Sequence, residues 1–525
     1  MKKHRLAKVR VHRLLGLARL LTRGERQLLS MSLLALIVSV EFFENIMFVF
    51  SASHIMGGIH ADPRSFALAQ SAYALGSMLM IVNQQSFAQR FGYRRYLTAA
   101  LTVFALGTLA AASSGDLSQL VTARLIQGFG GGALFTSSRI LILVMFSPAD
   151  RPRAQRFFIL GIFIASAMAP AVAAELMEHG VWQDVFYGAV PFAVIAAIGA
   201  WYLLPDAEPK SRVHKQVLIP LLWFGIAVAA LQAAMTEARF DMFSHPGRPA
   251  AIAVAGALLL AGFLHHQWRT STPLLHLRVL HNPVFLTGLA LYFMYYLISF
   301  MNSYLFPIYA EHALQIPLST VGWLDTLAGA ISLAGVVIYV RYAKLLKRKK
   351  PLIVAGLFVM AFAAWRFSVM PPGIPPGALL LGLATKGLFG VMVVIPIAGL
   401  TFRSLNDSTF GHGYQSKNLM RQIASSLAAA LGAVLLQNRQ FSVHAALADG
   451  TGNRPEATLR WLGHVRNAML AHGMDAGSAT QAAIARFEGV VDQQAMLIAS
   501  EDIYRLIAVL AIAGAFVVLA QRRLV

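Results

Sequence analysis

The chain has 525 residues, of which 57% are hydrophobic and only 13% are charged, about half of the roughly 25% usual in soluble domains. This composition favours a membrane protein over a soluble domain, and the absence of cysteine excludes disulfide bonds and thiolate metal sites. The net charge of +21 alone would suit a nucleic-acid-binding protein, but its distribution along the chain argues against that class.

Fourteen apolar runs follow one another along the chain, each long enough to cross a hydrocarbon layer, which takes about 20 residues. They lie at roughly 28–51, 66–86, 96–114, 118–146, 154–176, 184–204, 215–236, 249–266, 284–310, 319–340, 351–370, 376–400, 413–437 and 503–521. Alternation with a period of two is not evident, which argues against an outer-membrane barrel. We therefore predict an all-α membrane protein with fourteen transmembrane helices.

Residues 1–27 form a basic segment before the first apolar run, with nine Lys and Arg residues placed among Leu and Val. No small-residue cleavage site follows it, so we do not expect a cleavable signal. The segment is either a solvated tail or a basic amphipathic helix that lies on anionic lipid. Its frequent apolar positions favour the second interpretation.

The basic residues are distributed unevenly between the two sides of the predicted membrane. If the N-terminus is inside and the runs alternate, the inner segments hold 30 Lys and Arg residues and the short outer loops hold three. This asymmetry follows the positive-inside rule and predicts that both termini are cytoplasmic. The excess charge then reflects topology, so we expect no nucleic-acid partner.

Two long segments between spans have a predicted role. Residues 205–283 are predicted to be a linker with two extra spans, joining six-helix halves at 28–204 and 284–525. The outer loop 438–502 spaces its apolar residues by three and four in two stretches, which predicts two helices, the second running into the last span. This periplasmic loop either packs on the outer face or binds a partner.

Charged residues inside the apolar runs are the first candidates for function, because a charge at mid-membrane costs at least a few kcal/mol. They are Glu41, Glu44, Arg124, Asp325, Arg366, Lys386 and Arg421, whereas Glu175 and Arg139 lie nearer span ends, where the side chain can reach the interface. Glu41 and Glu44 lie three apart, on one helix face. Burial and mutual repulsion make two such carboxylates easier to protonate, which suits a proton relay or a site for a cationic substrate. Alternatively, each pairs structurally with an arginine elsewhere.

The fourth run contains "ARLIQGFGGG" at 123–132. Arg124 is a natural partner for a buried acid, and Gln127 falls on the same helix face, where we expect it to contact substrate. The glycines remove side chains, so that another helix can approach closely. A phosphate-binding loop is excluded, because no Gly-Lys-Ser or Gly-Lys-Thr follows and no strand precedes.

The fifth run places Ala165, Ala169 and Ala173 four residues apart around Pro170, which interrupts one backbone hydrogen bond. This pattern predicts a closely packed, bent helix, along which two bundles could rock, although most patterns of this kind serve packing alone.

The ninth run, "LYFMYYLISFMNSYLFPIYAEH" at 291–312, is rich in Tyr and Phe. Such faces suit flat lipophilic ligands and cations, so Tyr295, Phe300 and Asn302, together with Tyr73 of the second run, are candidates for substrate binding. An interfacial aromatic belt is the alternative. Asp325 lies alone within the tenth run and is a second candidate for a proton site.

Several of these segments together resemble the major facilitator superfamily, and in particular its fourteen-helix drug:proton antiporter branch. "ARLIQGFGGG" looks like the R-x-x-Q-G motif of the fourth helix, with Arg124 as its arginine. "APAVAAELMEHGVW" at 169–182 looks like the antiporter motif of the fifth helix, which Pro170 and Trp182 fit, with alanines in place of glycines. "FENIMFVFSAS" at 43–53 occupies the place of the acidic first-helix motif, with Glu44 instead of the usual Asp.

The loop "QSFAQRFGYRR" at 85–95 resembles the family's G-x-L-x-D-R-x-G-R-R motif. Arg90, Gly92 and Arg95 fit it, whereas Gln85 and Gln89 replace its Gly and Asp. Near the C-terminus, 418–436 and 490–506 are similar to the family's last two helices and the segment that joins them.

The resemblance implies two six-helix bundles with two additional helices between them, and proton-driven export of lipophilic molecules by alternating access across a bacterial inner membrane. Glu44, assisted by Glu41 or Asp325 and facing Arg124, would carry the proton, and Arg90, Gly92, Arg95 and Pro170 would serve the conformational change. The expected partners are a small lipophilic substrate, protons and membrane lipid, with no cofactor or metal. Some members of the branch work with a periplasmic adaptor and an outer-membrane channel, for which 438–502 would be the docking site.

Three other functions stay open at this point. The same fold could serve an uncoupled facilitator, an exporter of one specific metabolite, or a sensor. A polytopic membrane enzyme is disfavoured, because the 16 histidines lie mainly in loops without an H-E-x-x-H or comparable spacing.

Overall fold

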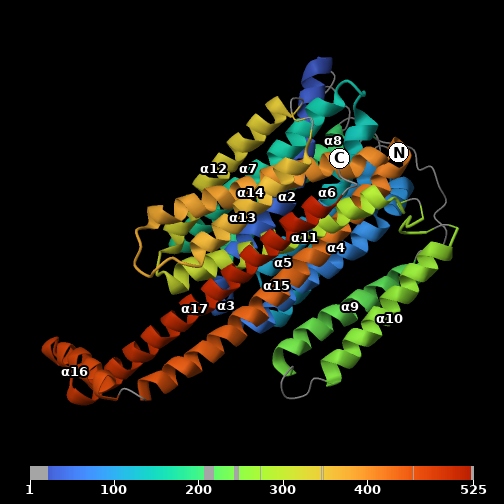
Figure 1. The fold of residues 1–525 in the computed structure, drawn as a ribbon. Coiled ribbons are helices and arrows are strands. Elements are labelled where there is room, and N and C mark those ends of the chain that lie inside the picture. Colours follow the sequence, from blue (N-terminus) through green and yellow to red (C-terminus); the bar gives the residue numbers. More distant parts are fainter. Residues whose placement is uncertain are drawn as a thin grey trace, which may run out of the picture.

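The computed structural model describes residues 22–205, 218–241, 247–271, 273–278, 280–343, 346, 348–452 and 455–521. All regular elements in these ranges are helices (Figure 1). Thirteen of the described helices are long and apolar enough to cross a membrane, and α9 (Leu218–Asp241) adds a shorter apolar stretch at Ile219–Met235. The predicted all-α membrane fold is thus confirmed. Most of the basic N-terminal segment lies outside the described residues.

The first half of the chain forms one bundle around α6. Its helices are α2 (Arg23–Phe50), the short α3 (Ala52–Gly58), α4 (Pro63–Phe91), α5 (Tyr93–Ala112), α6 (Leu117–Met145), α7 (Arg151–His179) and α8 (Asp184–Leu203). Both α4 and α5 pack along α6, while α2 packs against α7 and α8. The glycines of α6 make this possible. A Cβ on Gly128 would lie 2.3 Å from the carbonyl oxygen of Tyr73 in α4.

The second half forms a matching bundle. Its elements are α11 (Pro283–Ile308), η2 (Tyr309–Ala313), α12 (Leu318–Tyr342), α13 (Lys350–Phe367), η3 (Pro376–Ala378), α14 (Leu379–Thr401), η4 (Phe402–Ser404), α15 (Asp407–Gly452), α16 (Pro455–Ala471) and α17 (Ala476–Ala520). Here α13 packs against α14 and α17, and α11 packs against α15.

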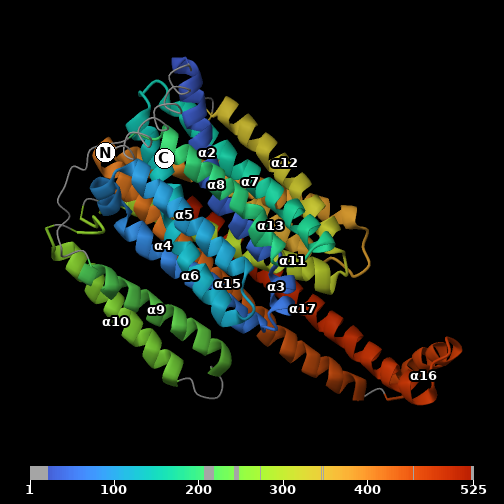
Figure 2. The same ribbon diagram turned by 180° about the vertical axis from the view of Figure 1, so that it is seen from behind.

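The linker helices α9 and α10 (Gly247–Arg269) form an antiparallel pair at the side of the molecule, visible in both ribbon views (Figures 1 and 2). Of the pair, α9 contacts α4 and, less extensively, α15. The two additional helices are therefore central in the chain but peripheral in space.

The two halves meet along two seams, α7 with α12 and α4 with α15. At the first seam, a Cβ on Gly329 would lie 2.6 Å from that of Ala167, and a Cβ on Gly322 would lie 2.7 Å from the carbonyl oxygen of Pro170. Next to the proline, the Ala171 amide donates to the Thr326 hydroxyl of α12 at 3.1 Å. The small-residue helix predicted in the fifth run is thus a packing surface, and its partner is a glycine-containing helix of the other half.

The helices α15 and α17 continue far beyond the bundle and carry α16 at their tip (Figure 1). With 46 residues, α15 is about 70 Å long, roughly twice the thickness of a hydrocarbon core. The second predicted loop helix does run into the last span as α17, but the extension of α15 past residue 437 was not predicted. We call the end from which this extension projects the α16 end, and the opposite end, where α2 begins and α17 stops, the terminal end.

Candidate functional site

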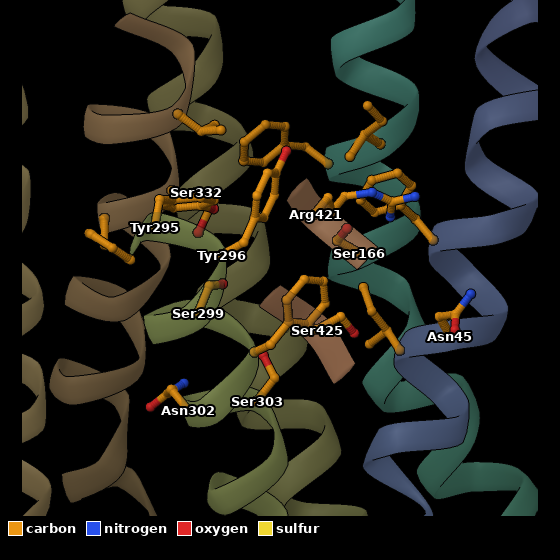
Figure 3. A pocket seen from close by; sticks show the side chains of 18 of the residues that line it. Asn45, Ser166, Tyr295, Tyr296, Ser299, Asn302, Ser303, Ser332, Arg421 and Ser425 are labelled. Carbon is orange, nitrogen blue, oxygen red and sulfur yellow. The ribbon is translucent and has the colours of Figure 1, made fainter. Parts of the chain in front are cut away.

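A cavity of about 840 Å³ lies between the two halves. It is lined by α2, α4, α6 and α7 of the first half and by α11, α12, α14 and α15 of the second. Figure 3 shows Asn45 and Ser166 facing Tyr296, Ser299 and Ser303 across this space. Its size is within the range of small-molecule sites, and many of its lining side chains are aromatic.

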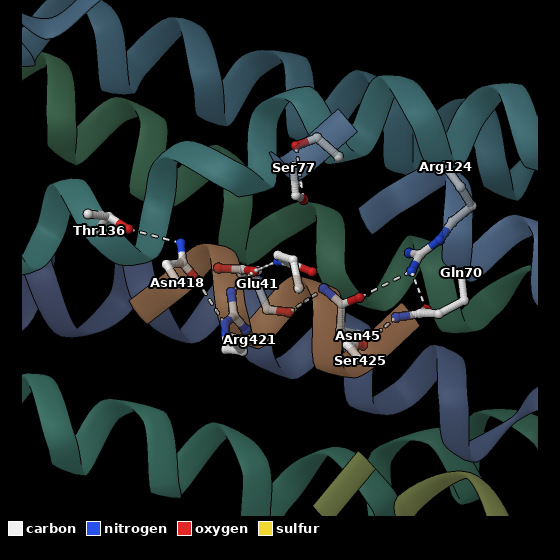
Figure 4. Close-up of polar contacts among 11 residues, drawn as sticks. Glu41, Asn45, Gln70, Ser77, Arg124, Thr136, Asn418, Arg421 and Ser425 are labelled. Carbon is white, nitrogen blue, oxygen red and sulfur yellow. Dashed lines mark hydrogen bonds and ion pairs between the residues drawn. The ribbon is translucent and has the colours of Figure 1, made fainter. Parts of the chain in front are cut away.

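The first buried ion pair joins Glu44 of α2 to Arg124 of α6, with 2.7 Å between the carboxylate and the guanidinium. Both side chains are fully buried. Arg124 also donates to Gln127 at 2.6 Å. It donates further to Asn45 at 3.1 Å and to Gln70 at 3.3 Å (Figure 4). The guanidinium therefore has one charged and three neutral acceptors, all within the first half.

Two sequence predictions concern this network. Glu44 pairs with an arginine, which was the alternative to a proton or substrate site, and it is not among the residues lining the cavity. Gln127, which we expected to contact substrate, is not among the residues lining the cavity either; it accepts from Arg124 and donates to Thr108 at 2.8 Å. Both residues orient Arg124, whose guanidinium also lies 4.0 Å from the ring centroid of Phe48.

The second ion pair crosses between the halves. Glu41 of α2 lines the cavity, and its carboxylate accepts hydrogen bonds from Arg421 and, at 3.3 Å, from Gln422, both on α15 (Figure 4). Asn418 accepts from Arg421 at 2.9 Å and itself donates to Thr136 of α6 at 2.9 Å. A polar chain thus connects the two halves beside the cavity.

The two glutamates serve different partners because a spacing of three residues turns the side chain by about 60° around the helix axis. Glu44 is thereby directed to α6 and Glu41 to α15. The sequence singled out Arg421 as an intramembrane charge but assigned it no role. Its partner lies 380 positions away, so no local pattern could identify the pair.

Asp325 is the third acid candidate with a basic partner, and like Glu41 it lines the cavity. Its carboxylate accepts from Lys386 of α14 at 2.9 Å, and both side chains are partly exposed to the cavity. This pair lies wholly within the second half. Asp325 therefore differs from Glu41, whose ion pair must break if the halves move apart at this level.

The three aromatic candidates for substrate binding, Tyr73, Tyr295 and Phe300, line the cavity, as does Asn302. Tyr295 and Asn302 come from α11 (Figure 3). The ring centroid of Tyr295 lies 5.0 Å from that of Phe389 in α14, so the wall here is a packed aromatic surface.

The conformational-motif candidates lie outside the cavity lining. Arg90 and Arg95 are exposed at the turn between α4 and α5, and Gly92 caps α5 with a φ of 78°. Only glycine adopts that conformation without strain, so Gly92 is needed for the turn itself. Pro170 lies at the α7–α12 seam, as described above.

Cross-half contacts are present at both ends of the bundle. At the terminal end, Arg151 of α7 pairs with Asp407 of α15 at 3.0 Å. At the α16 end, the Ser53 hydroxyl donates to Glu311 of η2 at 2.8 Å. Each contact therefore joins the two halves near one end of the bundle. Among the described residues, no group of three or more His, Asp or Glu side chains is placed to hold a metal ion.

Comparison with known proteins gives the family. The model of the Major Facilitator Superfamily matches residues 33–429. The "Uncharacterized MFS-type transporter YhcA" of Bacillus subtilis is 24% identical over 76% of this chain and 74% of its own length. The "Putative multidrug resistance protein MdtD" of Salmonella paratyphi A is 25% identical over 71% of this chain and 79% of its own length.

Solved structures agree at the level of the fold. The proton:xylose symporter XylE matches with a TM-score of 0.56 and 13% identity, covering 94% of this chain and 95% of that one. The POT family transporter PepTSo matches with a TM-score of 0.58 and 12% identity, covering 94% of this chain and 97% of its own.

Proposed function

Because the chain belongs to the Major Facilitator Superfamily, we propose that it is a proton-driven exporter of lipophilic or amphiphilic small molecules. The family resemblance to the antiporter branch supports this proposal, as does the name of the relative MdtD, which refers to multidrug resistance. The large aromatic cavity between the halves offers a site for such a substrate.

The observation that carries the proposal is the cross-half pair of Glu41 and Arg421. Separating the halves beside the cavity requires this buried pair to break, which gives up the attraction between two opposite charges in a low-dielectric site. Protonation of Glu41 removes the negative charge and with it most of that attraction. Proton binding at a cavity wall would thereby be linked to movement of one half against the other, which is how alternating access proceeds in these folds.

The proposed direction of transport combines the predicted topology with the resemblance to antiporters. The positive-inside rule predicts that the terminal end is cytoplasmic, so protons would enter from the α16 end. Each charge that moves inward down a potential of 100 mV releases about 2.3 kcal/mol. We therefore propose that inward proton movement drives outward movement of the substrate.

The test uses the purified protein in liposomes that enclose a pH-sensitive dye. Amphiphilic probes with one ring system and different charges, namely pyrenebutyrate, pyrenebutanol and pyrenebutylamine, are added under an imposed proton gradient. We expect at least one probe to move against its own gradient, with counterflow of protons, and an uncoupler to abolish this movement. Flux insensitive to the uncoupler would favour a facilitator, and the absence of any flux would favour a sensor or an enzyme.

Alternating access predicts that joining the halves at either end stops transport. The chain contains no cysteine, so paired substitutions provide the only thiols. Arg151→Cys with Asp407→Cys tests the terminal end, and Ser53→Cys with Glu311→Cys tests the α16 end. A short bifunctional thiol reagent should abolish export in each double variant, and reductive cleavage of the reagent should restore it. The single-cysteine variants treated with the same reagent are the controls; full transport in a cross-linked protein would contradict the rocking movement.

A further inference from the structure

Three basic side chains surround one pair of aromatic rings in the cavity wall. Phe135 of α6 and Tyr414 of α15 are stacked with 5.4 Å between their centroids. The Lys417 ammonium lies 4.4 Å from the Phe135 centroid and 4.9 Å from that of Tyr414. The Arg421 guanidinium lies 4.9 Å from Phe135, and that of Arg139 lies 5.7 Å from Tyr414. We call Arg139, Lys417 and Arg421 the basic cluster.

Carboxylates do not balance this cluster. Of the acids in the described cavity wall, Glu41 is paired with Arg421 and Asp325 with Lys386. Arg139 donates to the neutral side-chain amide of Gln155 at 3.2 Å, and no carboxylate among the described residues forms an ion pair with it. The cluster therefore contains three basic side chains but only one carboxylate.

Lys417 is the member whose position most needs an explanation. Lys417 lies near the start of the thirteenth apolar run and was not among the charged candidates taken from the sequence, but only 5% of its surface is exposed, inside the cavity wall. Besides Phe135 and Tyr414, its ammonium approaches Tyr292 at 4.9 Å and Tyr296 at 5.7 Å. Cation–π contacts return only part of the cost of burying a charge, so an anion beside this ammonium would be strongly favoured.

The cavity thus differs from what the two glutamates alone suggested. An acidic pair in the first helix suits a cationic substrate, but both acids are occupied by arginines. The charge left over in the wall is positive. Around it lie aromatic side chains such as Tyr295 and Phe300, which suit an apolar body.

We propose that the substrate is an amphiphilic organic anion, whose charged group binds between Lys417 and Arg139 and whose apolar body packs on the aromatic wall. This inference rests on the proposed function and names the substrate class of the same cavity. An anion that also reaches Arg421 replaces Glu41 as its partner. Binding of the anion and protonation of Glu41 would then each break the ion pair between Glu41 and Arg421 that joins the halves. The empty, deprotonated carrier keeps the pair, as exchange transport requires.

Equilibrium binding of the three pyrene probes to the full-length protein in lipid nanodiscs tests the inference, with the signal of empty nanodiscs subtracted. We expect pyrenebutyrate to bind roughly tenfold or more tightly than pyrenebutanol, and pyrenebutylamine to bind weakest. Lys417→Gln should weaken pyrenebutyrate binding about tenfold while changing pyrenebutanol binding less than about twofold. Lys417→Arg should retain the preference for the anion.

The matched control is Arg439→Gln, which removes a cation from the same helix, outside the cavity lining, and should leave all three affinities unchanged. Tighter binding of the amine than of the butyrate would overturn the inference, as would an unchanged affinity for butyrate in Lys417→Gln. The inference would also be overturned if Lys417→Gln and Lys417→Arg both weakened the binding of pyrenebutyrate and of pyrenebutanol to the same extent. Lys417 would then only stabilise the fold. The binding assay applies no proton gradient, so it can be interpreted even if the protein proves not to couple transport to protons.

Discussion

Replacing Glu41 by Gln is expected to convert the exporter into a facilitator. The amide resembles the protonated acid, so Arg421 loses its charged partner permanently and the halves can move without a proton. Export against a substrate gradient in proteoliposomes should fall roughly tenfold or more, while downhill flux and substrate exchange persist. The measurement compares uphill and downhill flux of the best-transported probe under one imposed proton gradient.

The control for this change is Glu175→Gln, which neutralises an exposed acid of α7 that pairs only with His179 among the described contacts. That variant should export like the parent protein. If Glu41→Gln still drives uphill export, Glu41 is not the coupling acid. The same assay on Glu44→Gln and Asp325→Asn then identifies which of the other acids is.

The second large effect concerns stability. Arg124→Ala removes the only cation beside the buried Glu44 among the described residues and leaves Gln127, Asn45 and Gln70 without their donor. An uncompensated buried carboxylate costs about 3–5 kcal/mol. We expect a clear fall in the unfolding temperature of the purified protein, measured by intrinsic tryptophan fluorescence in detergent.

A double-mutant cycle separates the ion pair from general damage to α6. Combining Arg124→Gln with Glu44→Gln should cost less than the sum of the single changes, with a coupling of about 1–3 kcal/mol. Arg439→Ala, which breaks an exposed pair with Asp502, should cost less than about 1 kcal/mol and is the control. Additive effects of the two buried changes would show that Glu44 and Arg124 do not stabilise one another.

These two predictions divide between Glu41 and Glu44 the roles that the sequence assigned to both. The motif resemblance put Glu44 first as the proton carrier, but its partners all belong to its own half. Glu41 lines the cavity and faces the other half. We accordingly propose Glu44 as an anchor of the first bundle and Glu41 as the residue whose protonation is coupled to movement.

The sequence by itself determined the class of fold and most of the helices, because a membrane-spanning helix depends on the hydrophobicity of about 20 consecutive residues. It also identified Glu41, Glu44, Arg124 and Asp325, because a charge inside an apolar run is conspicuous wherever the run packs. The glycines of α6 and the alanines around Pro170 likewise marked close-packed surfaces before their partners were known.

Only the tertiary structure decided which charges meet. Glu41 and Arg421 are 380 positions apart, and the direction of each side chain depends on how its helix is rotated against the other half. For the same reason the sequence did not predict that Lys417 lies in the cavity wall. Lys417 is four residues before Arg421, near the start of a span, where a basic residue is typical of the adjoining inner loop. Pairing between distant helices is set by the packing of whole faces, which no local pattern records, and that packing leaves more basic than acidic side chains in the cavity wall.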